Sequence, residues 1–144
     1  MEKDKFVLVY KSKIVKIAGT DFHEVYGEAF DFYKLEKRKT KRRPYLRSAY
    51  FDKEKVFLDL FWIHIGEKQN FRDKIRRMKF FPCAIDLIKN SKFPPTSKEN
   101  PNKRSEILHR FKGKSRDSDL FFVQIKENKK SGQKWLISVF PCKK

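Results

Sequence analysis

Three apolar-rich runs in the last third of the chain are separated by polar loops and predict three β-strands. The runs cover 107–112, 120–127 and 134–140, and each is rich in β-branched and aromatic residues. The loop 128–132 between the second and third runs has the length of a hairpin connection and includes a glycine near its exit. The pattern therefore predicts a small antiparallel sheet at the C-terminal end of the chain.

Strict alternation of apolar and polar positions indicates a register for the last two strands. Placing Ile125 opposite Trp135 gathers apolar side chains on one face and leaves Gln124, Lys126 and Ser138 on the other. A slip of one residue would turn polar side chains toward the core, so alternation favours this register.

A β-hairpin and several helices are expected before this sheet. Two short apolar runs, 5–10 and 13–18, have the pattern of a hairpin. Asp21, with Glu24 three residues later, is typical of a helix start, and the helix is expected to continue to about Lys37.

The middle of the chain is predicted to be helical as well. The most apolar run, 56–65, fits a buried helix that begins near Asp52, although its periodicity does not exclude a strand. Asn70 predicts the cap of a basic helix over 71–80, and a short helix over 83–89 follows.

The proline-rich stretch 91–103 is expected to be a loop. The order of elements predicts an α+β fold, with an N-terminal β-hairpin and several helices packed on a small C-terminal antiparallel β-sheet. One domain over 1–144 is expected, since the chain has neither an internal repeat nor a convincing linker.

Charge indicates the class of partner. The chain has 36 Lys and Arg against 18 Asp and Glu, a net charge of +18. This excess favours polyanions, nucleic acid before an anionic membrane. The two cysteines are too few for a disulfide scaffold or a zinc site, and the chain contains no run of membrane-spanning length. An intracellular, cytoplasmic protein without a membrane partner is therefore expected.

Common catalytic motifs are absent from the sequence. It has no HExxH, no phosphate-binding glycine loop and no GxSxG elbow, and its three histidines lie far apart. The simplest interpretation of His64 is a core or helix-end residue, and that of His23 is a surface residue near a helix cap. Neither a metal nor another cofactor is expected.

Cleavage of RNA through the substrate's own 2′-hydroxyl is one chemistry that suits a basic sheet surface without a metal. His109 could transfer protons, and Arg110, Lys112 and Lys126 could hold the phosphate, while Ser138 could donate a hydrogen bond to it. In a regular strand the first two of these residues point to opposite faces, so a twist, a bulge or a strand end would be needed for both to act.

The run 34–47 is the densest cluster of positive charge and is a candidate strip for phosphate contacts. A merely solvated surface is the alternative. The candidate nucleic-acid contacts are His23, Lys39, Lys41, Arg42, Arg43, Arg76, Arg77 and Gln124.

The C-terminal pattern HRFKG, FFVQIKE and WLISVF resembles the barnase–EndoU–colicin–RelE superfamily of metal-independent RNases. The stretch 20–27, TDFHEVYG, is similar to an N-terminal motif of one group in it. The resemblance implies a site on the sheet with Arg110, Lys112, Lys126 and Ser138, and adds the His109 and His23 side chains as candidates. It also implies an acidic antitoxin or immunity protein as a partner.

A toxin-like endoribonuclease that cleaves tRNA or mRNA is therefore the expected function. Two alternatives stay open. The same basic surface would serve a non-catalytic RNA- or DNA-binding domain, and the chain could be a partner-binding component of a phage-defence or mobile-element system.

Overall fold

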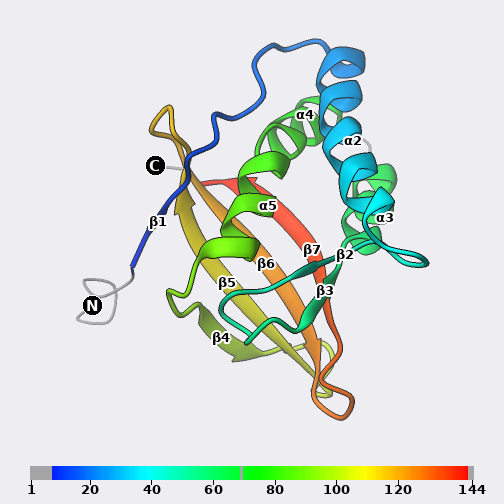
Figure 1. The fold of residues 1–144 in the computed structure, drawn as a ribbon, viewed down its shortest axis with the longest axis vertical. Helices are drawn as coiled ribbons and strands as arrows, with labels where there is room; N and C mark the ends of the chain where they lie inside the picture. Colours follow the sequence, from blue (N-terminus) through cyan, green and yellow to red (C-terminus); the bar gives the residue numbers. More distant parts are fainter. Residues whose placement is uncertain (1–7, 69, 143–144) are drawn as a thin grey trace.

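The computed structural model describes residues 8–68 and 70–142, which form an α+β fold (Figure 1). The helices are α2 (Phe22–Arg38), α3 (Asp59–Glu67), α4 (Phe71–Lys79) and α5 (Phe81–Asn90). The strands are β1 (Tyr10–Lys11), β2 (Tyr45–Arg47), β3 (Lys55–Phe57), β4 (Thr96–Glu99), β5 (Glu106–Lys114), β6 (Leu120–Asn128) and β7 (Lys134–Pro141). The prediction of an α+β fold is confirmed.

All of these strands join one mixed sheet. Its order is β1-β5-β6-β7-β3-β2, and β4 pairs with the part of β5 that β1 does not occupy. Strands β5, β6 and β7 are antiparallel to one another, whereas β1 runs parallel to β5 and β3 runs parallel to β7. The expected small antiparallel sheet is thus the centre of a wider, mixed sheet.

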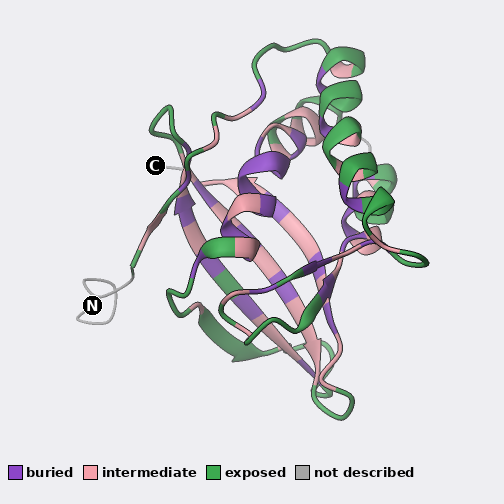
Figure 2. Ribbon diagram, in the orientation of Figure 1, coloured by how far each residue is buried: buried purple, intermediate pink, exposed green. Residues whose placement is uncertain are grey.

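The helices cover one face of this sheet. α3 and α4 pack against β7, α5 packs against β2 and β5, and α2 packs on α4 and α5 (Figure 1). The burial colours alternate along β5, β6 and β7, as expected when one strand face meets a core (Figure 2). The buried side chains of these strands include Phe111, Phe121, Val123, Ile125, Leu136 and Val139.

A β-bulge interrupts the pairing of β6 and β7. Gln124 lies opposite Ser138, but Ile125 lies opposite Leu136, so Ile137 is an extra residue in β7. As a result, the even-numbered residues Lys134 and Leu136 are buried before the bulge, and the odd-numbered Val139 is buried after it.

The observed register of β6 and β7 differs from the one that strict alternation predicts. Ile125 pairs with Leu136 and not with Trp135. Beyond the bulge, Phe122 pairs with Phe140, and both side chains stay half-buried on the face away from the helices. A rule of strict alternation cannot reproduce a strand that changes parity.

The prediction of an N-terminal hairpin is wrong. Residues 5–7 lie outside the described part of the chain, 13–18 form no strand, and β1 pairs with the distant strand β5. The hydroxyls of Tyr10 and Ser12 donate to Asp86 Oδ2 on α5, at 3.0 and 2.7 Å. These long-range contacts, which a local pattern does not reveal, hold the segment in place.

Three short strands also replace expected helix or loop. The run 56–65 divides between β3 and α3, the expected loop 91–103 contains β4, and β2 forms where a loop was expected after α2. Strands of three or four residues carry too little periodicity to be recognised, and pairing with neighbours determines them.

The helix caps are confirmed. The Asp21 side chain accepts a hydrogen bond from the Glu24 N–H at 3.0 Å, and Asn70 accepts one from the Asp73 N–H at 3.1 Å. Pro82 stands in the first turn of α5, where its missing N–H costs no helical hydrogen bond. Among the described residues, no helix combines the length and apolarity needed to cross a membrane.

Gly113 gives a test of the contact between β5 and its neighbours. A Cβ atom at Gly113 would lie 2.6 Å from Phe121 Cζ and 2.9 Å from Leu87 Cδ1, both of buried side chains. We expect Gly113→Ala to lower the free energy of unfolding by about 1–3 kcal/mol in urea denaturation.

Gly66→Ala in α3 is the matched control, since its added Cβ would meet no atom within 4 Å. It should leave the free energy of unfolding unchanged or raise it by up to about 1 kcal/mol, because alanine favours helix. Equal stability of Gly113→Ala and the unsubstituted protein would contradict the described packing of β5.

Candidate functional site

The sheet face turned away from the helices carries a cluster of cations and aromatic rings. We call this surface the outer sheet face. It comprises Leu108, Arg110, Lys112, Phe122, Gln124, Lys126, Trp135, Ser138 and Phe140, with Phe57 and Tyr45 on the neighbouring strands. All of these side chains are exposed or half-buried, whereas their neighbours along the central strands face the core.

One row of this face brings together residues from three strands. Arg110 pairs with Gln124, and Gln124 pairs with Ser138. Arg110 Nη2 donates to Gln124 Oε1 at 3.3 Å. From α4, Arg77 Nη1 donates to Ser138 Oγ at 2.6 Å. The Ser138 hydroxyl is therefore bonded to one guanidinium group, and a second one lies in the same row two strands away, an arrangement suited to a phosphate group.

The next row places cations over aromatic rings. The Arg110 guanidinium lies 5.4 Å from the Phe122 ring centre and 5.3 Å from that of Phe140. Arg77 lies 5.5 Å from the same Phe140 ring, and Lys112 lies 5.9 Å from Phe122. Cation–π contacts of this kind orient the charged groups over the sheet.

An ion pair within α4 holds Arg77 in this position. Asp73 Oδ2 accepts from Arg77 Nε at 3.0 Å, and Asp73 Oδ1 accepts from Arg76 at 3.3 Å. Burial alone would raise the pKa of the Asp73 carboxyl, but the hydrogen bond and charge of Arg77 hold that pKa below its ordinary value. The carboxylate thus stays ionised in mild acid and fixes the guanidinium next to β7.

A cleft of about 510 Å³ opens beside Ser138 and Arg77. His64, Glu67 and Lys68 of the α3 end also line it, and His64 Nδ1 is hydrogen-bonded to Glu67 Oε1 at 3.2 Å. His64 lies in the last turn of α3, which confirms the helix-end interpretation, but the sequence did not indicate that it lines a cleft with Ser138. No spacing in the sequence links this histidine to a serine on β7, because only tertiary packing brings α3 to that strand.

At the other end of the face, Lys126 stands over Trp135, 5.1 Å from its ring centre. Lys126 Nζ also lies 3.4 Å from the buried Glu106 carboxylate. Burial alone would raise the pKa of Glu106, but a hydrogen bond from Asn100 and the charge of Lys126 lower it. Part of the lysine's charge is therefore compensated within the protein.

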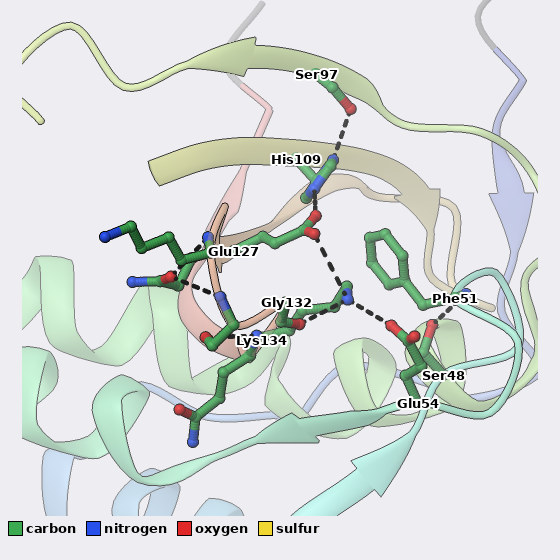
Figure 3. A network of polar contacts seen from close by, with 12 residues as sticks. Ser48, Phe51, Glu54, Ser97, His109, Glu127, Gly132 and Lys134 are labelled. Carbon is green, nitrogen blue, oxygen red and sulfur yellow. Dashed lines mark hydrogen bonds and ion pairs between the residues drawn. The ribbon is translucent and has the colours of Figure 1, made fainter. Parts of the chain in front are cut away.

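His109 lies on the opposite face of β5, apart from Arg110. It is only 8% exposed, and its Nδ1 and Nε2 are hydrogen-bonded to Ser97 Oγ at 2.6 Å and Glu127 Oε1 at 2.7 Å (Figure 3). Phe51 packs edge-on against its ring. The structure does not bring this histidine together with the other predicted catalytic residues.

The hydrogen-bonded chain through His109 continues to a buried lysine. Lys134 Nζ lies 3.7 Å from Glu127 Oε2, forms an ion pair with Glu54 and donates to the Gly132 carbonyl at 2.8 Å (Figure 3). Hydrolytic triads also contain a serine, a histidine and a carboxylate. Here the serine belongs to β4, whose backbone pairs with β5, and the network ties this edge strand to the sheet.

The predicted strip, 34–47, covers the end of α2, the loop after it and β2, and most of its basic residues are exposed. Lys41 and Arg42 are exposed, whereas Lys39 pairs with Glu36 at 3.6 Å and Arg43 pairs with Asp59 at 2.9 Å. His23 is exposed at the start of α2, where its ring contacts Phe22 in the helical layer and lies apart from the sheet. Of the predicted nucleic-acid contacts, Arg77 and Gln124 are the two that join the row at Ser138.

No group of three or more His, Cys, Asp or Glu side chains suited to a metal ion occurs among residues 8–68 and 70–142. Comparison with protein-family models, curated proteins and solved structures finds no match for this chain.

The network around His109 predicts a large difference between two substitutions. His109→Ala leaves a cavity and removes a hydrogen-bond partner of Glu127, so it should lower the free energy of unfolding by about 2–4 kcal/mol. Ser97→Ala removes one hydrogen bond from an exposed strand and should cost about 0.5–1.5 kcal/mol. Denaturant unfolding measures both, and equal losses would contradict the structural role assigned to His109.

Proposed function

We propose that this protein is a metal-independent endoribonuclease whose active site is the outer sheet face at Ser138. The observation that carries the proposal is the alignment of Arg110, Gln124 and Ser138 across three strands, with Arg77 bonded to the serine at 2.6 Å. A hydroxyl bonded to the Arg77 guanidinium, with the Arg110 guanidinium in the same row, suits a phosphodiester whose negative charge grows during reaction.

The reaction needs no nucleophile from the protein. The 2′-oxygen of the RNA attacks the adjacent phosphorus while the bond to the 5′-oxygen breaks. One proton leaves the 2′-hydroxyl and one is delivered to the departing 5′-oxygen, so the products are a 2′,3′-cyclic phosphate and a 5′-hydroxyl. The protein must bind the phosphate, stabilise the charge on its oxygens and transfer protons.

Each of these tasks has a candidate residue. Arg77 and Arg110 hold the phosphate oxygens, and Ser138 donates a hydrogen bond to one of them. Lys112 adds positive charge to the same face. His64 lines the cleft shared with Arg77 and Ser138, which makes it the candidate for proton transfer.

The resemblance to the barnase–EndoU–colicin–RelE superfamily supports the same proposal, since it also implies a site with Arg110, Lys112, Lys126 and Ser138. A toxin-like role follows from that resemblance. An acidic antitoxin would find charge complementarity on the outer sheet face, where it would compete with RNA for the same cations.

A non-catalytic RNA-binding domain is the second candidate. The half-buried rings of Phe122, Phe140 and Trp135 favour it, because aromatic rings that are partly open to solvent beside cations can stack bases without cleaving RNA. Cleavage distinguishes the two candidates.

Cleavage of labelled RNA in EDTA tests the proposal. The unsubstituted protein should leave 2′,3′-cyclic phosphate ends, and Arg110→Ala and Ser138→Ala should each lower kcat by about 10²–10³-fold, as expected when a donor to transition-state charge is lost. Lys92→Ala, on an exposed residue after α5, is the charge control and should retain full activity. RNA binding with no cleavage by the unsubstituted protein, on either tRNA or mRNA, would favour the binding domain.

The same assay separates the two candidate histidines. His64→Ala should lower kcat by about 10²-fold or more, since it removes a proton-transfer group. His109→Ala, assayed where it remains folded, should retain kcat. A loss of kcat confined to the folded His109→Ala protein would assign proton transfer to the buried histidine instead.

A further inference from the structure

The outer sheet face continues beyond the proposed active site as a row of aromatic rings. Lys126 pairs with Trp135, Trp135 pairs with Phe57, and Phe57 pairs with Tyr45. Residues paired in register point to the same face of a sheet, so three aromatic side chains lie next to one another on β7, β3 and β2. With a strand spacing of about 4.8 Å, the row crosses about 10 Å of surface.

Each ring of this row has a cation close to it. Arg43 lies 4.4 Å from the centre of Phe57, and Lys55 and Arg47 lie 4.7 and 5.2 Å from that of Tyr45. The Tyr45 and Phe57 rings are themselves in edge contact, 6.1 Å apart. A base can stack on such a ring or on the guanidinium plane above it, while the neighbouring cations meet the phosphates.

The row ends at a cationic pocket of about 630 Å³. The pocket is lined by Lys39, Thr40, Lys41, Arg42, Arg43, Tyr45, Lys55, Phe57 and Gln133. Glu36 and Asp59 compensate Lys39 and Arg43. Lys41 and Arg42 are exposed and have no acidic partner among the described residues, so their charges are available to a polyanion.

We infer that this row, from Trp135 through Phe57 to Tyr45, is a binding track for single-stranded RNA that ends in the cationic pocket. The inference rests on the proposed function for the choice of RNA and deepens it by naming the substrate class. Unpaired bases can stack on the rings, whereas bases inside a duplex are stacked on each other and cannot reach them. An acidic protein or an anionic membrane would satisfy the cations but would leave the rings without stacking partners.

The track predicts that affinity depends on RNA length. An oligonucleotide of about 12 nucleotides can cover both the Ser138 site and the pocket, whereas a dinucleotide, with one phosphodiester, cannot. Binding is measured by fluorescence anisotropy with 2′-O-methyl RNA, which lacks the attacking hydroxyl and therefore reports affinity independently of cleavage.

Charge reversal tests the pocket. Lys41→Glu/Arg42→Glu should weaken binding of the longer RNA by about 10-fold or more at moderate salt and should leave the shorter RNA within about 2-fold. Lys13→Glu/Lys92→Glu is the control, because it changes the net charge equally at two exposed residues outside the outer sheet face. Equal weakening by both double variants would show a purely nonspecific charge effect and overturn the track.

Stacking is tested by Tyr45→Ala and its conservative counterpart Tyr45→Phe. Tyr45→Ala should weaken binding of the longer RNA by about 5- to 100-fold, and Tyr45→Phe should restore it, since the ring is retained. Duplex RNA that binds as tightly as the single strand, or an unchanged affinity in a folded Tyr45→Ala protein, would overturn the track.

The two proposals fail in different ways. Suppose that binding depends on RNA length and on Tyr45, but unmodified RNA is not cleaved in EDTA. This result would support the RNA-binding track and contradict the endoribonuclease function. Equal kcat/KM on short and long RNA, unaffected by Tyr45→Ala, would keep the nuclease and reject the track.

Discussion

The β-bulge at Ile137 determines which side chains of β7 meet the core and which face away from it. Before the bulge, Leu136 is buried, and after it Val139 is buried, although their positions differ by three and strict alternation would place them on opposite faces. The extra residue allows both to face the helices while Ser138 and Phe140 lie on the outer sheet face. Bulges commonly re-aim side chains at functional sites, and here one bulge brings a hydroxyl to Arg77 of α4.

The two faces of the sheet hold charge for different purposes. On the helix side, Glu127 lies between His109 and the buried Lys134, so these groups compensate each other and stabilise the sheet edge. On the outer side, Asp73 is shared by Arg76 and Arg77, and Glu106 lies beside Lys126 and Lys103, so each carboxylate positions more than one cation. Much of the net charge of +18 therefore remains available to a polyanion, at positions that packing and cation–π contacts define.

Features encoded by neighbouring residues were predictable from the sequence. The caps at Asp21 and Asn70 and the three long strands follow from local chemistry and periodicity, and they agree with the structure. Features that depend on distant pairing were not: β2, β3 and β4 are too short for periodicity, and a bulge violates strict alternation. For the site, the cations of β5 were recognisable as candidates, but the place of His64 beside β7 and the burial of His109 required the tertiary structure.

We propose that RNA binds the outer sheet face, and ultraviolet cross-linking to thiouridine-containing single-stranded RNA tests this most directly. After digestion, mass spectrometry identifies the peptides that carry a nucleotide. Cross-links should fall on β2, β3, β6 and β7, at rings such as Tyr45, Trp135 and Phe140. Cross-links confined to the helical layer, for example near His23 on α2, would place the RNA on the other side of the molecule and contradict the account.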